Sequence, residues 1–405
     1  MRRIHSVAQN DQAPPLTGSQ SSINYAIALV AVVLITYLFG CTMLYSTSSI
    51  SDGANYFTKQ LQWGVVGTGA AFTIWALGYK RLSKLSLLLI IITIILLFVA
   101  RYWFPPIKGA YRWIKIPGVG SLQPSEYAKL AAVLYSAKFC SENIRFINKY
   151  KTILIGNAPI VFILAAVFLG KDLGTTCLIA IVVLVLHFCA GLRLRETLFP
   201  ICALTPILYF VIKNFDPMRW ARLTSFMNPE IYKATIGYQL WRSLLALGSG
   251  GWTGLGFTES RMKAEYLPED HTDFILSIVG EELGFVFICL VILVYLIMMF
   301  IGVQISIRAR SKHGMLLGIG VTCLVVFQSL INVGVVSGAL PTKGMPAAFI
   351  SYGGSNLVLC LSCIGILLSI AHDSVAPNYN DKMIARAKEK IKKIITKKEV
   401  KPRSF

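Results

Sequence analysis

The stretch LGFVFICLVILVYLIMMFIGVQISI, residues 283–307, carries no charged side chain. A helix of this length, rising about 1.5 Å per residue, is longer than the roughly 30 Å hydrocarbon core of a bilayer. Because that core offers no water, the backbone polar groups of a spanning segment must pair within the segment itself. The stretch therefore predicts a transmembrane helix.

The same kind of apolar run recurs along the chain. Hydrophobic residues make up 55% of the 405 residues and charged ones only 14%, whereas soluble domains are about 25% charged. We therefore predict an all-α polytopic membrane protein with about ten transmembrane helices, within a single domain at 23–372. The other predicted spans are 23–45, 61–79, 85–100, 124–137, 152–169, 173–190, 197–212, 314–340 and 347–371.

The distribution of basic residues predicts the orientation. Ten spans place both termini on one side, and the segments on that side hold 24 Lys and Arg against 14 on the other, seven of which lie in 213–272. Long translocated loops influence topology little, so this side is predicted to be cytoplasmic and 213–272 to be the outward loop between helices seven and eight. Residues 1–22 then form a cytoplasmic segment without a removable signal peptide. The basic tail 373–405 is expected near anionic membrane lipid, not nucleic acid.

Acidic residues cluster where the outward loop meets the quoted helix. Seven of the 19 Asp and Glu residues lie between 259 and 282, and charge so close to hydrocarbon indicates a functional site. A solvated loop is the structural alternative. Asp273 directly precedes an apolar run, so an N-cap is its main structural alternative. Glu281 and Glu282 lie about two turns deeper, where they must pair with cations or face a cavity.

Cations are predicted on the same outward face. Glu126 and Lys129 are spaced i, i+3 and can pair, and Lys343 lies between two prolines as a candidate ligand for phosphate or carboxylate. Arg112, Arg242 and Lys263 complete the set. Carboxylates beside cations at the membrane surface suit the binding of a lipid-linked anionic substrate. This pattern is equally compatible with an enzyme and with a transporter.

Two further patterns have structural readings. Within 238–257, Leu240, Trp241, Leu244 and Leu245 share one helical face, which predicts a short helix in the membrane interface. The nine cysteines lie within or at the ends of the apolar runs, so neither a disulfide framework nor a metal site is predicted.

Six motifs follow one another along the chain: GAYRWI (109–114), QPSEYAK (123–129), DLGT (172–175), GYQLWRSLLALGSGGWTGLGF (237–257), YLPEDHTDF (266–274) and PTKG (341–344). Together, and in this order, they resemble the SEDS family of bacterial cell-wall polymerases. The resemblance covers essentially residues 23–372, and PTKG is more similar to the division members than to the elongation members. Two positions depart from the family pattern: Gly170-Lys171 stands where many members have Gln-Pro, and Ala348 replaces a proline.

The resemblance implies a glycosyltransferase that polymerises lipid II. It implies that Asp273 of the HTDF motif is catalytic, as general base for the 4-hydroxyl of the incoming GlcNAc. The departing undecaprenyl diphosphate would be stabilised by cations in an inverting displacement. Of the substrate-binding candidates, the resemblance implies Lys129, Lys343, Arg112 and Glu265, and the charges of the outward face add Arg242, Glu126 and Lys263. The supporting candidates are Glu281, Glu282, His271 and Asp172. No cofactor is assigned, although a divalent cation at the diphosphate would fit.

The implied partners are the nascent glycan strand, a class B penicillin-binding protein that crosslinks it, and other division proteins. The implied location is the bacterial inner membrane at the division septum. Two alternatives remain at this stage, a lipid II flippase and a division scaffold without chemistry of its own.

Overall fold

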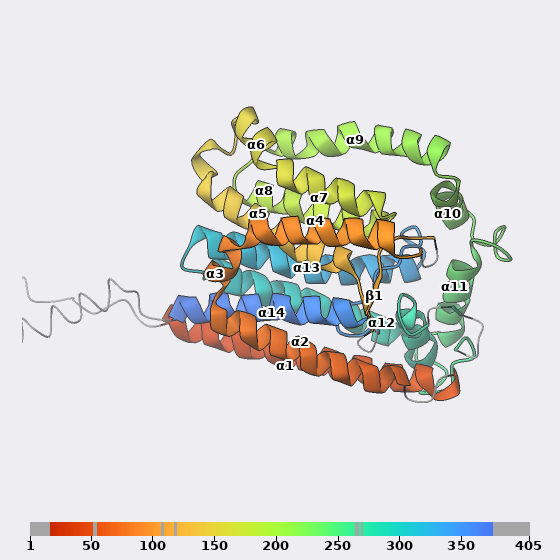
Figure 1. The fold of residues 1–405 in the computed structure, drawn as a ribbon. Helices are drawn as coiled ribbons and strands as arrows, with labels where there is room; N and C mark the ends of the chain where they lie inside the picture. The colour runs from red at the N-terminus through yellow and green to blue at the C-terminus, as the bar shows by residue number, and fades with distance from the viewer. Residues whose placement is uncertain are drawn as a thin grey trace, which may run out of the picture.

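The computed structural model describes residues 17–51, 55–106, 109–116, 120–263, 267–268 and 270–375. Long helices dominate and run roughly side by side (Figure 1). The predicted all-α class is confirmed, with one small addition in the described part of the chain. Strands β1 (Ile114–Ile116) and β2 (Gly120–Leu122) pair antiparallel, with Ile114 opposite Leu122.

All ten predicted spans coincide with helices over most of their length. The helices before the long outward loop are α1 (Thr17–Ser51), α2 (Asn55–Leu77), α3 (Tyr79–Lys84), α4 (Ser86–Trp103), α5 (Pro124–Glu142), the 3-10 turn η1 (Ile144–Phe146), α6 (Tyr150–Gly156), α7 (Ala158–Leu169), α8 (Leu173–Cys189) and α9 (Leu194–Phe215). Those that follow are α10 (Pro217–Met227), α11 (Tyr238–Gly250), α12 (Ile275–Ile307), α13 (Lys312–Val336) and α14 (Gly354–Val375).

Length and composition single out five membrane-spanning candidates in the described residues. They are Ser21–Thr47, Ser86–Trp103, Ile275–Ile307, Lys312–Val336 and Gly354–Val375. The remaining predicted spans are shorter or less apolar helices, so the count of ten stays a prediction.

The interior of the bundle is formed around α13 and α14. In their most apolar windows 72% and 78% of residues are buried, against 28% in α4 and in α12. The bare apolar faces of α4 and α12 are the surfaces that lipid would cover, because apolar side chains there meet no protein. Helix α13 packs on α5, α8, α12 and α14. Helix α13 therefore lies at the centre of the bundle, in contact with most of the helices that form its interior.

The predicted outward loop contains two helices, α10 and α11, at one end of the bundle (Figure 1). A helix at 238–250 was predicted, but its proposed apolar face is divided. Leu240 is 1% exposed on the side that packs on α12, whereas Leu245 is 38% exposed. Only part of the predicted apolar face of α11 therefore packs against the protein.

Helix α12 is interrupted near its start. Gly284 has φ 83° and ψ 179°, so the regular hydrogen bonds of the helix cannot continue through it. The chain at 251–256 replaces them: the N–H groups of Leu255 and Gly256 donate to the carbonyls of Glu281 and Glu282, and the N–H of Phe285 donates to Gly251. These bonds fix the residues that precede the long apolar part of α12.

The predicted span 347–371 is helical only from Gly354. Met345 and residues 347–350 are apolar and buried but irregular, with Phe349 at φ 67°. Their backbone is satisfied by side chains of neighbouring helices: Tyr295 donates to the carbonyl of Ala348 at 2.8 Å, and the N–H of Ala348 donates to Ser329 at 3.1 Å. Irregular backbone is tolerated at this depth because it is buried in protein.

Candidate active site at the outer end of the bundle

Asp273 lies immediately before α12, and its side chain is partly buried. The N-cap of α12 is Phe274, without a side-chain capping bond, so Asp273 does not have the capping role that competed with a functional one. The main-chain carbonyl of Asp273 accepts a hydrogen bond of 2.7 Å from Nδ2 of Asn332 on α13. The interior of the protein thus holds the backbone that carries this carboxylate.

Three distant motifs meet at Gly344. A Cβ on Gly344 would lie 2.9 Å from Oδ2 of Asp273 and 3.4 Å from Nη2 of Arg112. The HTDF carboxylate, the GAYRW guanidinium and the PTKG turn are therefore packed against one another. Sequence analysis predicted these side chains on one face, and the structure brings them together.

Arg112 is held on its other side by Asp172. Its Nη1 lies 3.6 Å from Oδ1 of Asp172, which is 4% exposed. Asp172 caps α8, accepting from the N–H of Thr175 at 3.3 Å, and also accepts from the hydroxyl of Ser125 at 2.8 Å. The fixed carboxylate at this helix start thus orients the guanidinium that faces Asp273.

Lys343 lies over the same helix start. Its Cδ would be 3.4 Å from a Cβ on Gly174, within the DLGT motif. Among the described residues, no hydrogen bond or ion pair is formed by the Lys343 ammonium. A lysine beside a helix N-terminus favours an anionic ligand, because both contribute positive potential.

Arg222 on α10 interacts electrostatically with Arg112 and Asp273 and was missed from the sequence. The residue is exposed, yet desolvation of its enclosed part lowers its pKa, and the charge of Arg112 lowers that pKa further. Asp216 and Asp273 act in the opposite direction. The available signal was the arginine pair Arg219 and Arg222, spaced i, i+3 behind the capping Asp216. We call Arg112, Asp172, Arg222, Asp273, Lys343 and Gly344 the outer site.

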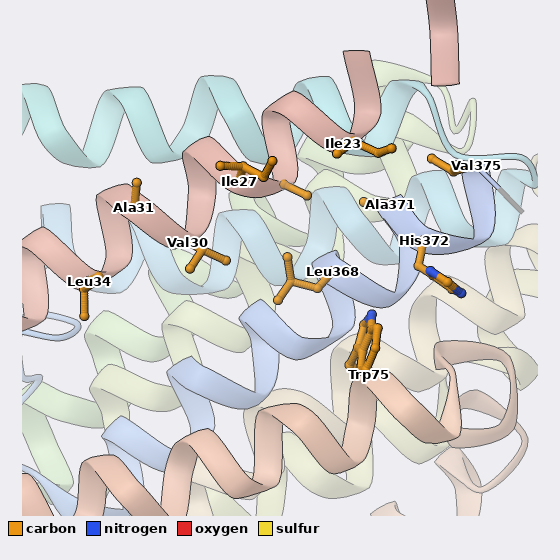
Figure 2. Close-up of a pocket in the computed structure, with 11 residues that line it drawn as sticks. Ile23, Ile27, Val30, Ala31, Leu34, Trp75, Leu368, Ala371, His372 and Val375 are labelled. Carbon is orange, nitrogen blue, oxygen red and sulfur yellow. The ribbon is translucent and has the colours of Figure 1, made fainter. Parts of the chain in front are cut away.

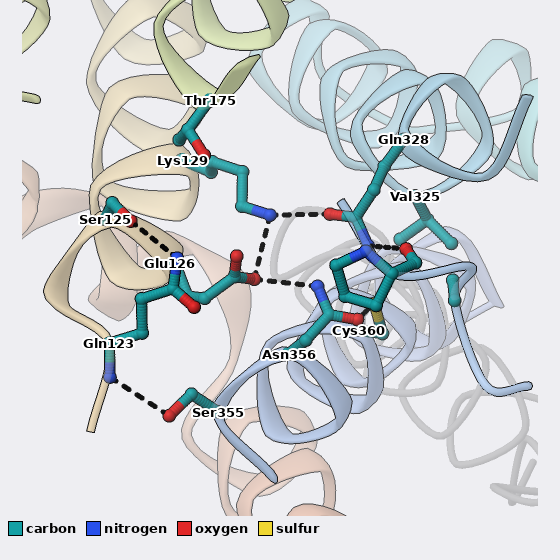
Figure 3. A network of polar contacts seen from close by, with 12 residues as sticks. Gln123, Ser125, Glu126, Lys129, Thr175, Val325, Gln328, Ser355, Asn356 and Cys360 are labelled. Atoms are coloured by element: carbon teal, nitrogen blue, oxygen red, sulfur yellow. Dashed lines mark hydrogen bonds and ion pairs between the residues drawn. The ribbon is translucent and has the colours of Figure 1, made fainter. Parts of the chain in front are cut away.

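Lys129 and Glu126 form the predicted i, i+3 pair, but inside the protein (Figure 3). Their charged atoms are 2.8 Å apart, and the two side chains are 1% and 3% exposed. Lys129 also donates to Oε1 of Gln328 at 2.5 Å, and Asn356 donates to Glu126 at 2.7 Å. Nε2 of Gln328 donates to the carbonyl of Pro346 at 3.0 Å, so this pair is linked through Gln328 to the segment that follows the PTKG motif.

Lys263, Glu281 and Glu282 lie in a second buried group. Lys263 pairs with Glu282 at 3.0 Å and donates to the carbonyl of Thr258 at 2.6 Å, and both charged side chains are at most 1% exposed. Glu281 accepts from the hydroxyl of Ser260 at 2.5 Å and from the N–H of Arg261 at 3.0 Å. These contacts fold the end of the outward loop onto α12.

The remaining predicted residues are placed as follows. Nδ1 of His271 lies 2.9 Å from Oδ1 of Asp270, and its ring stacks on Tyr56 with centroids 4.0 Å apart. Arg242 on α11 lies over the ring of Tyr238, 5.2 Å from its centroid. Glu265 lies outside the described residues.

No group of three or more His, Cys, Asp or Glu side chains in the described part of the chain is arranged to hold a metal ion. An apolar groove between α1, α2 and α14 is lined by residues such as Leu34, Trp75, Leu368 and His372 (Figure 2). It carries no carboxylate or amine and shares no residue with the outer site.

Comparison with known proteins gives consistent matches along the chain. The family model described as "Cell cycle protein", which groups FtsW, RodA and SpoVE, matches residues 25–375. A relative in Geobacter metallireducens, "Probable peptidoglycan glycosyltransferase FtsW", is 34% identical over 86% of this chain and 94% of its own. Stage V sporulation protein E of Bacillus subtilis is 33% identical over 89% of this chain and 100% of its own.

Solved structures share the fold. RodA of Thermus thermophilus aligns with a TM-score of 0.64 and 23% identity, over 91% of this chain and 100% of that one. A chain from work on "polymerization and crosslinking by a peptidoglycan synthase complex" aligns with a TM-score of 0.72 and 24% identity, over 86% of this chain and 97% of that one.

Proposed function

The chain belongs to the FtsW, RodA and SpoVE family of cell cycle proteins, and on this premise we propose that it polymerises lipid II into glycan strands at the division septum. It is a multi-pass membrane protein and a peptidoglycan glycosyltransferase by this kinship. The finer proposal concerns the reaction, the residues that perform it and the place where it occurs.

The observation that carries the proposal is the contact at Gly344. A carboxylate and a guanidinium from distant parts of the chain lie against the same glycine, beside a lysine whose ammonium has no partner among the described residues. A general base next to preorganised cations suits a displacement in which a proton is removed while negative charge develops elsewhere.

In the proposed reaction Asp273 accepts the proton of the GlcNAc 4-hydroxyl. That oxygen bonds to C1 of the MurNAc at the end of the growing strand, and the bond from C1 to the diphosphate breaks. Undecaprenyl diphosphate leaves with the electron pair, and Arg112, Lys343 and Arg222 stabilise its charge. The displacement inverts C1 and requires no enzyme nucleophile.

Lys129 and Glu126 have a different part in this proposal. Their charges neutralise one another in the interior, so a contact with substrate would require the pair to separate. We assign them to support, through Gln328, of the segment that follows the PTKG motif. The substrate-binding roles of Arg242, Glu265 and Lys263 stay predictions from the sequence, as does a divalent cation at the diphosphate.

The partner proposed is a class B penicillin-binding protein, which crosslinks the strands that this chain makes. Support comes from the solved relative, described as part of a complex that coordinates polymerization and crosslinking. A septal location is proposed from the match to relatives named FtsW.

The test uses purified protein with its cognate penicillin-binding protein and labelled lipid II in detergent micelles. Polymer from wild type and none from Asp273→Ala supports the proposal. A flippase or a scaffold makes no polymer in micelles, so a silent wild type would refute it. Equal polymer from both proteins would remove Asp273 as the base.

A further inference from the structure

One buried amide holds both chain segments that meet at the outer site. Asn332 on α13 is 0% exposed. Its Nδ2 donates to the carbonyl of Asp273 at 2.7 Å and to the carbonyl of Met345 at 2.7 Å. An amide nitrogen has two N–H donors, so both are used by these main-chain oxygens.

The two carbonyls belong to the backbone that presents the base and the lysine. Asp273 carries the carboxylate at the start of α12. Met345 closes a short turn, in which its N–H donates to the carbonyl of Lys343 at 3.0 Å. That turn carries Gly344, which lies against the carboxylate of Asp273. A movement of either carbonyl therefore changes the spacing between base and lysine.

Neighbouring polar side chains of α13 hold only one of the two segments. Gln328, one helical turn earlier, donates to the carbonyl of Pro346 at 3.0 Å. The hydroxyl of Ser329 accepts from the N–H of Ala348 at 3.1 Å. Both bonds fasten the segment after the turn to α13 and leave Asp273 untouched, so among these three side chains Asn332 alone joins the two segments.

We propose that Asn332 is a positioning residue, which sets the distance between the Asp273 carboxylate and the turn that carries Lys343 and Gly344. The inference rests on the proposed function. Asn332 is buried and acts through two backbone carbonyls, so it does not touch the substrate. Misplacement of reacting groups by about 1 Å can cost roughly 10²-fold in rate, so loss of this amide lowers turnover more than substrate binding.

The test compares Asn332→Leu and Asn332→Asp, which keep the approximate shape of the side chain and remove both N–H donors. Polymerisation of labelled lipid II by each variant, purified with its penicillin-binding protein, gives kcat and KM. We expect kcat to fall roughly tenfold or more and KM to stay within about threefold. Size exclusion and thermal unfolding report the folded fraction.

Thr322→Val is the matched control. Thr322 is a buried polar residue of the same helix, and its hydroxyl donates to the carbonyl of Gly318 within that helix. Because this bond holds no part of the outer site, its loss is expected to leave kcat within about twofold of wild type.

Two results overturn the inference: kcat unchanged in either variant, whether or not KM rises, or a loss of rate that equals the loss of folded protein. If leucine prevents folding, the aspartate variant decides. A wild type that polymerises and a silent Asp273→Ala uphold the proposed function even if the Asn332 variants are fully active. A wild type that makes no polymer defeats both, because Asn332 then has no reaction to position.

Discussion

At the scale of single residues, Gly344 is required for space and not for backbone freedom. Gly344 does not have a positive φ, so other residues could adopt its backbone conformation. The space for a Cβ is instead taken by Oδ2 of Asp273 at 2.9 Å and approached by Nη2 of Arg112 at 3.4 Å. Any side chain here therefore displaces the Asp273 carboxylate.

Gly344→Ala is therefore expected to lower polymerisation by roughly tenfold or more, because a small displacement of a base has a large effect on rate. The thermal midpoint should change little. Gly248→Ala on α11 is the control, since a Cβ there meets no atom within 4 Å, and it should retain wild-type activity. Full activity in Gly344→Ala would mean that the contact is not part of the working site.

The buried pair of Lys129 and Glu126 makes a prediction about stability. Lys129→Met leaves the Glu126 carboxylate buried without its cation, which costs about 3–5 kcal/mol. Glu126→Gln combined with Lys129→Met removes both charges and keeps an acceptor for Asn356. Thermal unfolding in detergent should show a large loss for the single variant and a partial recovery for the double one. A single variant as stable as wild type would contradict the pairing.

Local sequence signals found some site residues and not others. Asp273, Arg112 and Lys343 stand in recognisable motifs, and the i, i+3 spacing predicted the pair of Glu126 and Lys129. Asn332 was missed because a lone amide in an apolar helix has no visible partner until distant segments fold onto it. The spacing of Gln328 and Asn332, i and i+4, was the one available hint that α13 has a polar face.

At the scale of elements, the break in α12 depends on a conformation that only glycine adopts readily. Gly284 has φ 83° and ψ 179°, and a Cβ there would meet the carbonyl oxygen of Trp252 and lie 2.5 Å from the N–H nitrogen of Gly254. Strain and close contact therefore act together.

Gly284→Ala is expected to lower the thermal midpoint in detergent and the yield of monodisperse protein, because it separates the 251–256 segment from α12. Gly69→Ala on α2 serves as the control, since its Cβ would meet nothing within 4 Å. If the two variants unfold at the same temperature, the inserted segment does not stabilise the break.

Apolar runs predicted where helices lie but not where they begin. Residues 347–353 read as part of a span, yet the helix starts at Gly354. The difference arises because Tyr295 and Ser329 satisfy the backbone of Ala348 from other helices. Such partners are fixed by tertiary packing, which hydrophobic periodicity does not record.

At the scale of the whole molecule, the outer site is assembled at one end of the bundle from α10 and segments next to α5, α8, α12 and α14, and α13 packs on the last four of these helices. Composition and basic residues predicted a membrane protein with its polar chemistry at that end. The local spacing predicted that Lys129 can pair with Glu126 but not that the pair is buried. The pairing of Lys263 with Glu282 was not predicted, because it follows from the packing of the loop onto α12.

The central claim is that Asp273 removes a proton at a site of opposing charges. The direct measurement is lipid II polymerisation by Asp273→Asn, with the affinity for lipid II measured on the same preparation. Asparagine keeps the shape of the side chain beside Gly344 and Arg112 but cannot act as the base. We expect the affinity of Asp273→Asn for lipid II to stay within about threefold of wild type and its polymerisation rate to fall by about 10²–10⁴-fold. Polymerisation at the wild-type rate would contradict the central claim.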